Sequence, residues 1–357
     1  MENKYKYYAI TTTFIGAIFG AGFVSGQELL QFYASYGLYC IFGLLLMFIL
    51  YVTLAYMSMS LAYDKKVTSY EEVIVGDNEK AKSICNITIN VILFFVLIIM
   101  FAGAGALLNN FFGVSKFFGS IGLALVVMLI CLNGANGIVK VFSFIVPTMV
   151  VLAIISSILG IIYGNEPLNF NTVEFVKQPT PFWITSALLA VSYIFIVQIP
   201  ILSPLGIEAK NKKHILLGSF FGALIISIVA ALICFAMLKN INLIVGVDMP
   251  MLIISNNISS ILGIVYLVVL AIGIFSSSLA MMFALVNRLE QSTIKINNKV
   301  SIIFICMFAL FLSLIGFSNL ISIVYPIVGY IGFIANGGVI VQFIKNKRLK
   351  KTETINN

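Results

Sequence analysis

The chain has 357 residues, of which 61% are hydrophobic and only 10% charged, whereas soluble domains run near 45–50% and 25%. A water-exposed surface cannot be built from this composition, so the sequence predicts an integral membrane protein and excludes a sizeable soluble domain. The net charge of +8 is explained by basic loops beside anionic lipid, and a nucleic-acid partner is not expected.

Ten long apolar runs follow one another along the chain. Each predicts a membrane-spanning helix, because barrel strands span only about 9–11 residues and alternate strictly between polar and apolar. The predicted fold class is an all-α integral membrane protein of about ten transmembrane helices, with residues 1–357 as a single transmembrane domain. The runs cover residues 7–34, 37–62, 84–110, 117–135, 141–163, 183–205, 215–238, 258–284, 300–316 and 319–344.

Basic residues set the expected orientation, since lysine and arginine accumulate in cytoplasmic loops. With the N-terminus inside, all but three of the 21 basic residues fall in cytoplasmic segments. The exceptions, Lys116, Lys177 and Lys239, stand one to a loop. We therefore expect both termini in the cytoplasm, a cytoplasmic tail over residues 345–357, and a multi-pass protein of the cell (plasma) membrane.

The first apolar run is glycine-rich at its centre. As a straight helix it would be about 42 Å long, well over the ~30 Å thickness of the hydrocarbon layer. Glycine tolerates backbone angles that other residues do not, so Gly20, Gly22 and Gly26 predict an interruption of this helix. The alternative is that the glycines only allow neighbouring helices to approach closely.

The same run contains a carboxylate, Glu28. An ionisable group in a spanning segment is expensive and usually faces a cavity, a partner or a permeation path. No lysine or arginine remains in any run to pair with it. Glu28 is therefore expected to carry a proton, to be hydrogen-bonded by neutral groups, to lie near a bound cation, or to sit in a water-filled outer vestibule.

Later runs contain fewer polar residues. In the eighth run, the hydroxyl oxygens of Ser276 and Ser277 suit a small cation, although serine in a helix equally often bonds back to a preceding carbonyl. The sixth run has Ser192 and Tyr193, followed by prolines that predict either a second interruption or a plain kink. The loop 239–257 is apolar enough to form a lid over the outer end.

The stretch Gly20–Glu28, GAGFVSGQE, resembles the YkvI-type bacterial membrane proteins. More distantly, the chain resembles the amino acid–polyamine–organocation superfamily with the LeuT fold. This likeness implies two inverted five-helix repeats, about 7–163 and 183–344, with breaks in helices 1 and 6. It implies a substrate site formed by Gly20, Ala21, Gly22, Phe23, Ser192 and Tyr193. It also implies a sodium site formed by Gly16, Phe19, Ser276 and Ser277.

Glu28 falls outside the implied sodium site. Helical rise places it about 13.5 Å beyond Phe19, too far to bind the same ion directly. Its predicted role is that of a coupling or vestibule carboxylate.

The function predicted from these features is secondary active transport of a small organic solute, an amino acid or related zwitterion, coupled to Na⁺ or H⁺ by alternating access. The alternative is a receptor subunit on a transporter fold, similar to the membrane subunits of spore germinant receptors. An enzyme is not expected, because Glu28 has no second carboxylate or histidine beside it. No catalytic residue, no cofactor and no metal beyond a coupling Na⁺ is predicted, and the expected partners are the lipid bilayer and the solute.

Overall fold

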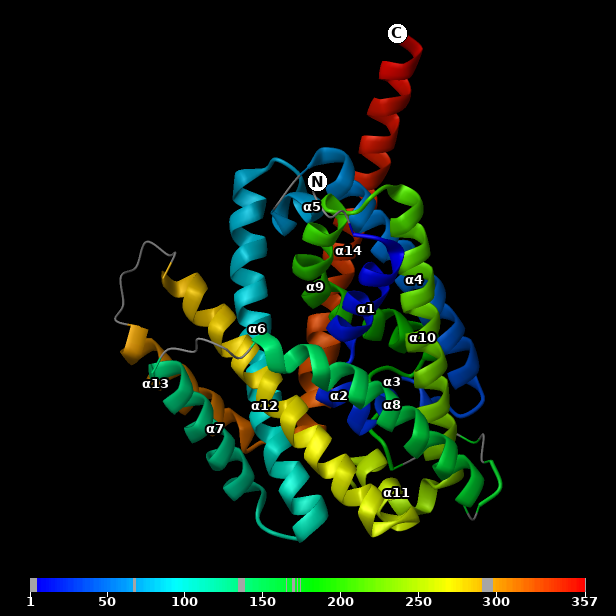
Figure 1. Cartoon of the computed structure of the whole chain (residues 1–357), viewed down its shortest axis with the longest axis vertical. Coiled ribbons are helices and arrows are strands. Elements are labelled where there is room, and N and C mark those ends of the chain that lie inside the picture. Colours follow the sequence, from blue (N-terminus) through cyan, green and yellow to red (C-terminus); the bar gives the residue numbers. More distant parts are fainter. Residues whose placement is uncertain are drawn as a thin grey trace.

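A computed structural model describes residues 5–66, 69–133, 139–164, 166–168, 171, 173, 175–290 and 298–356. These residues are almost entirely helical (Figure 1), which confirms the predicted all-α class. The helices are α1 (Tyr7–Ile18), α2 (Ala21–Ser25), α3 (Gln27–Phe32), η1 (Ala34–Tyr36), α4 (Tyr39–Lys65), α5 (Tyr70–Val75), α6 (Glu79–Phe112), α7 (Lys116–Asn133), α8 (Val139–Tyr163), α9 (Trp183–Ile207), α10 (Lys212–Lys239), η2 (Ile241–Ile244), α11 (Pro250–Ile258), α12 (Ser260–Glu290), α13 (Asn298–Ser313) and α14 (Phe317–Asn356).

Each predicted apolar run overlaps one of the main helices. Within the described residues, α4, α6, α9, α10, α12 and α14 are long and apolar enough to cross a membrane. Shorter apolar helices or helix segments lie in α1, α7, α8 and α13. The structure therefore supports a multi-pass protein, while the count of ten spans and the division into two repeats stay predictions. The expected tail differs in one respect, since α14 continues through it as far as Asn356.

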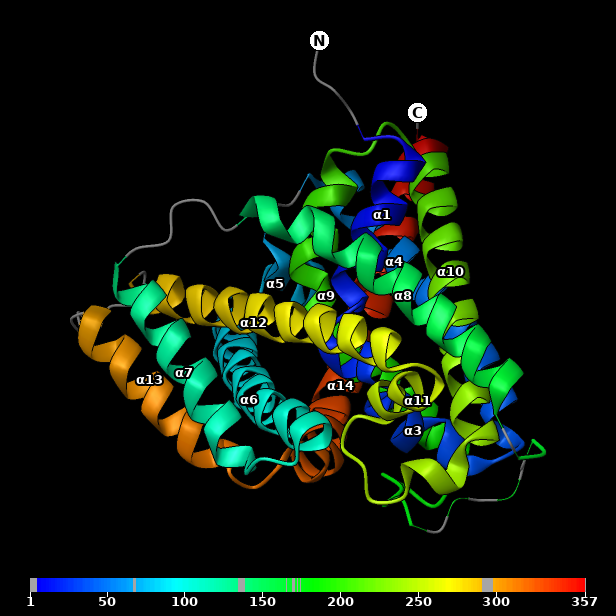
Figure 2. The ribbon, with the colours of Figure 1, turned by 60° about the horizontal axis from the view of Figure 1, so that its bottom comes forward.

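The helices pack in two groups. In one group, α9 packs against α4 and α14, and α10 packs against α1 and α4. In the other, α6, α7 and α13 pack against one another and α12 lies along α6, and this group stands to one side in both ribbon views (Figure 2). The start of α1 and the end of α14 lie at one end of the molecule, opposite α11. The membrane side on which the termini lie stays a prediction.

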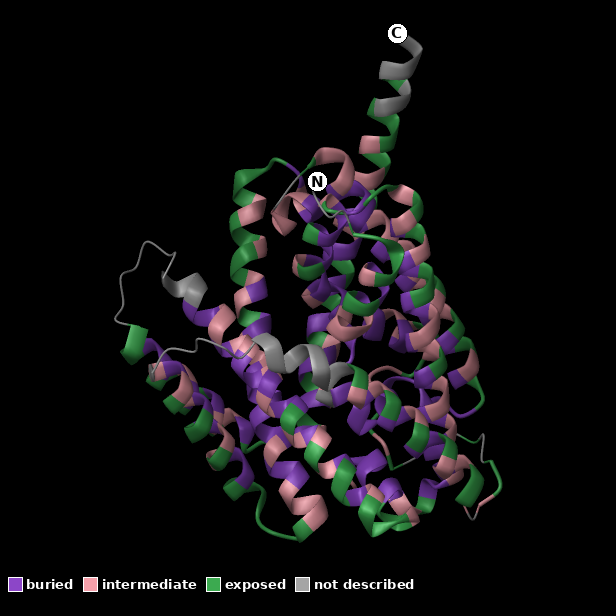
Figure 3. Ribbon diagram, in the orientation of Figure 1, coloured by how far each residue is buried: buried purple, intermediate pink, exposed green. Residues whose placement is uncertain are grey.

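Large apolar side chains cover the outward faces of the bundle. Buried residues concentrate where helices meet and exposed ones on the outer surfaces (Figure 3). Ile261, Phe304 and Ile334 are among the most exposed apolar side chains. The exposed apolar surface is too extensive for a protein that faces water, and it is suited to contact with lipid.

Helix 1 is interrupted, as the glycines predict. The Gly20 N–H bonds to the Ile18 carbonyl at 2.7 Å instead of to the Gly16 carbonyl, which a continuous helix would use. α1 therefore ends at Ile18 and α2 begins at Ala21. A second interruption follows at Gly26, whose φ of +85° is left-handed and favours glycine.

Helix 6 does not contain the break that the likeness to the LeuT fold implies. α9 is one α-helix of 25 residues that includes both Pro200 and Pro204. The two prolines fall in its last two turns, where each removes one amide donor from the helix. A spanning helix tolerates such a loss when neighbouring helices support it, and α4 and α14 both pack along α9.

Candidate functional site

The left-handed turn at Gly26 brings α3 back onto α2. As a result, the Glu28 side chain lies directly against the backbone of Gly22. A Cβ atom built on Gly22 would stand only 1.9 Å from Glu28 Oε1. This close approach is possible only because residue 22 has no side chain, so the glycines of helix 1 both interrupt the helix and make room for the carboxyl group.

Two tyrosines from distant parts of the chain meet this carboxyl group. The Tyr193 hydroxyl on α9 donates a hydrogen bond to Glu28 Oε2 at 2.6 Å. Tyr325 on α14 stacks on Tyr193 with ring centroids 4.3 Å apart, and its hydroxyl also interacts with Glu28. Glu28 is only 8% exposed, and no ion pair to it exists among the residues that the structure describes. Neutral groups alone therefore hold this buried carboxyl group.

Glu28, Tyr193 and Tyr325 line a cavity of about 140 Å³ at the interruption of helix 1. Gln198 on α9 and Ser277 on α12 add two more polar side chains to its wall. The other lining residues are glycine or apolar: Ala17, Ile18, Gly20, Gly22, Ile92, Val96, Met100, Ile194, Val197, Met281, Val324 and Val328. The cavity thus combines an apolar wall with a few polar groups, as solute sites commonly do.

Gln198 presents an unused acceptor. Its Nε2 donates to the Ala17 carbonyl beside the helix break. A carbonyl only accepts, so this bond fixes the orientation of the amide group. Gln198 is buried, and its Oε1 has no hydrogen-bond partner among the described atoms.

Half of the predicted substrate residues line the cavity. Gly20, Gly22 and Tyr193 do. Phe23 instead packs on the Phe19 ring, with centroids 5.0 Å apart. Ser192 is buried at a close approach of α9 to Gly332, where a built Cβ would lie 2.2 Å from the Ser192 carbonyl oxygen. The side chain of Ala21 lies outside the described residues.

Of the predicted sodium residues, only Ser277 is in the cavity wall. Ser276 is buried, and its hydroxyl bonds to the Gly273 carbonyl of its own helix at 3.0 Å. The Gly16 carbonyl does not receive the helical hydrogen bond from the Gly20 N–H, which goes to Ile18 instead. Neither Gly16 nor Phe19 is among the residues that line the cavity. A sodium site made from these four residues stays a prediction.

The expected position of Glu28 differs from the observed one. Helical rise predicts a carboxylate far beyond Phe19, but the turn at Gly26 returns it to the cavity that Ser277 also lines. Its burial also excludes an open outer vestibule in this conformation. Tyr325 is missed entirely from the sequence, where the only local signal is a tyrosine placed before a proline inside an apolar run.

A second cavity lies on the other side of α3. Gln27 and Gln31 on α3 line this outer cavity of about 190 Å³, together with Asp248 and Ser318. Both glutamines are buried, and their Oε1 atoms have no partner among the described atoms. The short helix α3 therefore separates the two cavities, with Glu28 on the inner one and the glutamines on the outer one.

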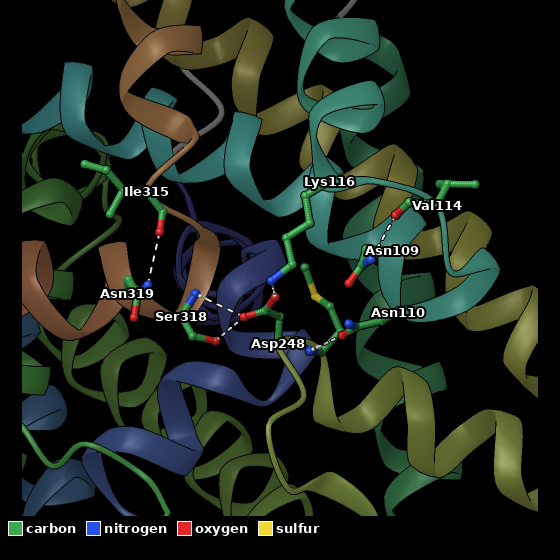
Figure 4. Close-up of polar contacts among 9 residues, drawn as sticks. Asn109, Asn110, Val114, Lys116, Asp248, Ile315, Ser318 and Asn319 are labelled. Carbon is green, nitrogen blue, oxygen red and sulfur yellow. Dashed lines mark hydrogen bonds and ion pairs between the residues drawn. The ribbon is translucent and has the colours of Figure 1, made fainter.

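The predicted lid closes over this outer cavity. Asp248, in the loop before α11, forms an ion pair with Lys116 of α7 and accepts a hydrogen bond from the Ser318 hydroxyl of α14 (Figure 4). The next residue, Met249, donates its backbone N–H to Asn110 of α6 at 2.8 Å. The loop is thereby attached to three helices beside the outer cavity that it lines.

Comparisons with known proteins agree with the architecture. No family model matches the chain. It is 26% identical over 353 residues, 97% of this chain and 99% of the relative, to the uncharacterized membrane protein YkvI of Bacillus subtilis (strain 168). It is 23% identical over 317 residues, 88% of this chain and 90% of the relative, to the uncharacterized protein YyaD of the same organism.

Solved structures share the fold at low sequence identity. MhsT in complex with L-phenylalanine has a TM-score of 0.62 at 13% identity, over 96% of this chain and 89% of that one. Mhp1 in an inward-facing conformation has a TM-score of 0.60 at 12% identity, over 92% of this chain and 75% of that one. The Eremococcus coleocola manganese transporter mutant H236A has a TM-score of 0.56 at 11% identity, over 96% of this chain and 85% of that one. The chain thus resembles the YkvI-type membrane proteins over nearly its whole length, as its helix 1 motif predicts, and its fold is that of the LeuT-type transporters.

Proposed function

We propose that this protein is a secondary active transporter that moves a small organic solute by alternating access, with the Glu28 cavity as the solute site. Its fold, shared with transporters, indicates a transporter rather than an enzyme. The observation that carries the proposal is the placement of a buried carboxyl group in a cavity at the interruption of helix 1. Burying such a group is costly, and in a spanning segment it usually marks a site of transport.

The solute of this proposed site carries an amino group, which places it in the broad class that includes the expected amino acids. The cavity supports this because its one carboxylate has no cation opposite it in the described lining.

Transport through this site is coupled to an ion, either Na⁺ or H⁺, as the sequence predicts. Glu28 is the better-supported coupling group, because it lines the cavity whereas the Ser276 hydroxyl bonds within its own helix. We place the protein in the cell (plasma) membrane with both termini in the cytoplasm.

Uptake into proteoliposomes tests this function. Purified protein is first screened for thermal stabilisation by amino acids and amines, because a ligand at 100 times its dissociation constant stabilises the folded state by about 2.7 kcal/mol. The stabilising compound is then offered to loaded vesicles with an imposed sodium or proton gradient. Gradient-driven uptake is expected, whereas binding with no flux in either direction would indicate a receptor and contradict the proposal.

A further inference from the structure

The polar groups of the Glu28 cavity are nearly all acceptors. Glu28 and Gln198 both line the cavity, and the buried Oε1 of Gln198 is an acceptor with no hydrogen-bond partner among the described atoms. The Tyr193 hydroxyl is already committed to Glu28, as is that of Tyr325. An ammonium group supplies three donors and a positive charge, which is what these acceptors lack.

A ligand carboxylate finds no cationic partner in the described lining of the same cavity. Its described lining contains no lysine, arginine or histidine. Beside α2, where the interrupted helix could receive an anion, Glu28 Oε1 already lies against Gly22. A second carboxylate placed there would face a like charge at short range in a low-dielectric site, which is strongly unfavourable.

The rest of the wall sets the size and polarity of the ligand. Apolar side chains such as Val96, Met100 and Val328 surround the polar end. An apolar cavity of about 150 Å³ takes a molecule the size of benzene, so about 140 Å³ suits about six heavy atoms.

One carboxyl group must then serve both the ammonium ion and the proton. The other titratable groups that face Glu28 are tyrosines: Tyr33, Tyr51 on α4, Tyr193 on α9 and Tyr325 on α14. The carboxyl group therefore either holds a proton or pairs with an ammonium ion, because an unpaired buried charge is costly. When the ammonium ion binds to the protonated form, the proton of Glu28 leaves to solvent.

Building on the proposed transport function, we propose that the cavity binds a small, largely apolar amine as its ammonium ion and exchanges it for a proton at Glu28. The amine lacks a carboxylate, which narrows the substrate from amino acids to their decarboxylated counterparts and similar monoamines. Amine and proton exclude each other at one carboxyl group, so one moves outward as the other moves inward.

Isothermal titration calorimetry of the purified protein with matched ligands tests this substrate class. Isopentylamine, leucine and 3-methylbutanol share one hydrocarbon group and differ in the carboxylate and the amino group. Isopentylamine is expected to bind at least about 30-fold more tightly than leucine or 3-methylbutanol, as the loss of a buried charge partner implies. A series from propylamine to hexylamine finds the best length, and failure of every amine to bind, or tighter binding of leucine, overturns the proposal.

The proton is detected separately. At pH values where Glu28 is protonated, the apparent dissociation constant of the amine should rise about tenfold for each unit of pH decrease. The heats measured in two buffers of different ionisation enthalpy should show one proton released for each amine bound. Amine binding that is independent of pH overturns the exchange.

Variants assign the effect to Glu28. Glu28→Gln should weaken amine binding about 30-fold or more and abolish its pH dependence. Glu28→Asp keeps the charge and should keep the pH dependence, which guards against a merely unfolded variant. Glu79→Gln removes an exposed carboxylate at the start of α6 and should change neither.

Flux measurements separate this proposal from the transporter function. Proteoliposomes with a pH gradient are compared with vesicles that contain Glu28→Gln, which corrects for neutral amine crossing the lipid. Glu28-dependent amine binding without flux contradicts transport and leaves the ligand class intact. Driven uptake of leucine without amine binding contradicts the ligand class and leaves the transporter intact.

Discussion

Glu28 Oε1 occupies the space in which the side chain of residue 22 would begin, 1.9 Å from an ideal Cβ on Gly22. Sequence neighbours six positions apart are thereby fixed in contact across the turn at Gly26. The backbone conformation beside the cavity and the position of the Glu28 carboxyl group therefore depend on each other. A change at Gly22 or at Glu28 disturbs both.

Gly22→Ala should therefore displace Glu28 although it adds only one methyl group. We expect the Tyr193 bond to be lost and ligand binding to fall about tenfold or more, as measured by calorimetry or thermal stabilisation. Gly122→Ala on α7 is the matched control, because its Cβ would meet no atom within 4 Å. Unchanged binding in Gly22→Ala would mean that the carboxyl group does not lie against residue 22.

Tyr193→Phe removes the donor to Glu28 and keeps the ring. Loss of a hydrogen bond to a buried polar group costs about 1–3 kcal/mol, so this variant should unfold at a lower temperature and bind ligand more weakly. Tyr330→Phe removes a hydroxyl from an exposed tyrosine on α14 and should stay within about 0.5 kcal/mol. Equal stability of the two variants would show that the Tyr193 bond contributes nothing.

Asp248→Asn should loosen the outer lid, since the amide cannot form the ion pair with Lys116. A cysteine introduced at Gln27, which lines the outer cavity, should then react several-fold faster with an impermeant thiol reagent. The exchange of charges in Asp248→Lys with Lys116→Asp should restore slow labelling in part, because the pair is regained but the Ser318 bond is not. Labelling that is equally slow in all three proteins would contradict a lid held by Asp248.

The membrane orientation predicted from basic residues is open to labelling in intact cells. Cysteines next to Lys177 and Asp248 should react with an impermeant reagent, and a cysteine next to Lys212 should not. Permeabilised cells, in which all sites react, provide the control. The reverse pattern would place the termini outside.

Sodium dependence distinguishes the two coupling ions. Since Ser276 bonds to its own helix and Glu28 lines the cavity, we expect Ser276→Ala with Ser277→Ala to leave uptake insensitive to sodium, as in the unaltered protein. Uptake measured at equal pH in sodium and in choline buffers checks this. A large rise in the sodium concentration needed by the double variant would instead establish a sodium site.

The features predicted correctly from the sequence are those with local causes. Long apolar runs give apolar helices because the requirement to bury backbone groups in lipid leaves little alternative. The break after Ile18 follows from glycines that weaken helix 1 at that place.

The features missed depend on single dihedral angles or on distant partners. A turn at one left-handed residue, Gly26, puts Glu28 against Gly22, and helical rise alone cannot anticipate such a turn. Tyr325 reaches Glu28 from the other end of the chain, with no pattern near either residue to link them. α9 stays continuous past its prolines because α4 and α14 support it, which depends on tertiary packing.

The thinness of α3 has an electrical consequence. A helix is about 10 Å across, whereas the hydrocarbon layer is ~30 Å thick. Where water fills the cavities on both sides of α3, most of the membrane voltage falls across this short segment, at about 2.3 kcal/mol per charge and 100 mV. A carboxyl group that is either protonated or paired with an ammonium ion is neutral in both states. A site with either partner bound therefore crosses this voltage drop without electrical work. An empty site, in which Glu28 is ionised and unpaired, carries a net charge and must do work against the voltage.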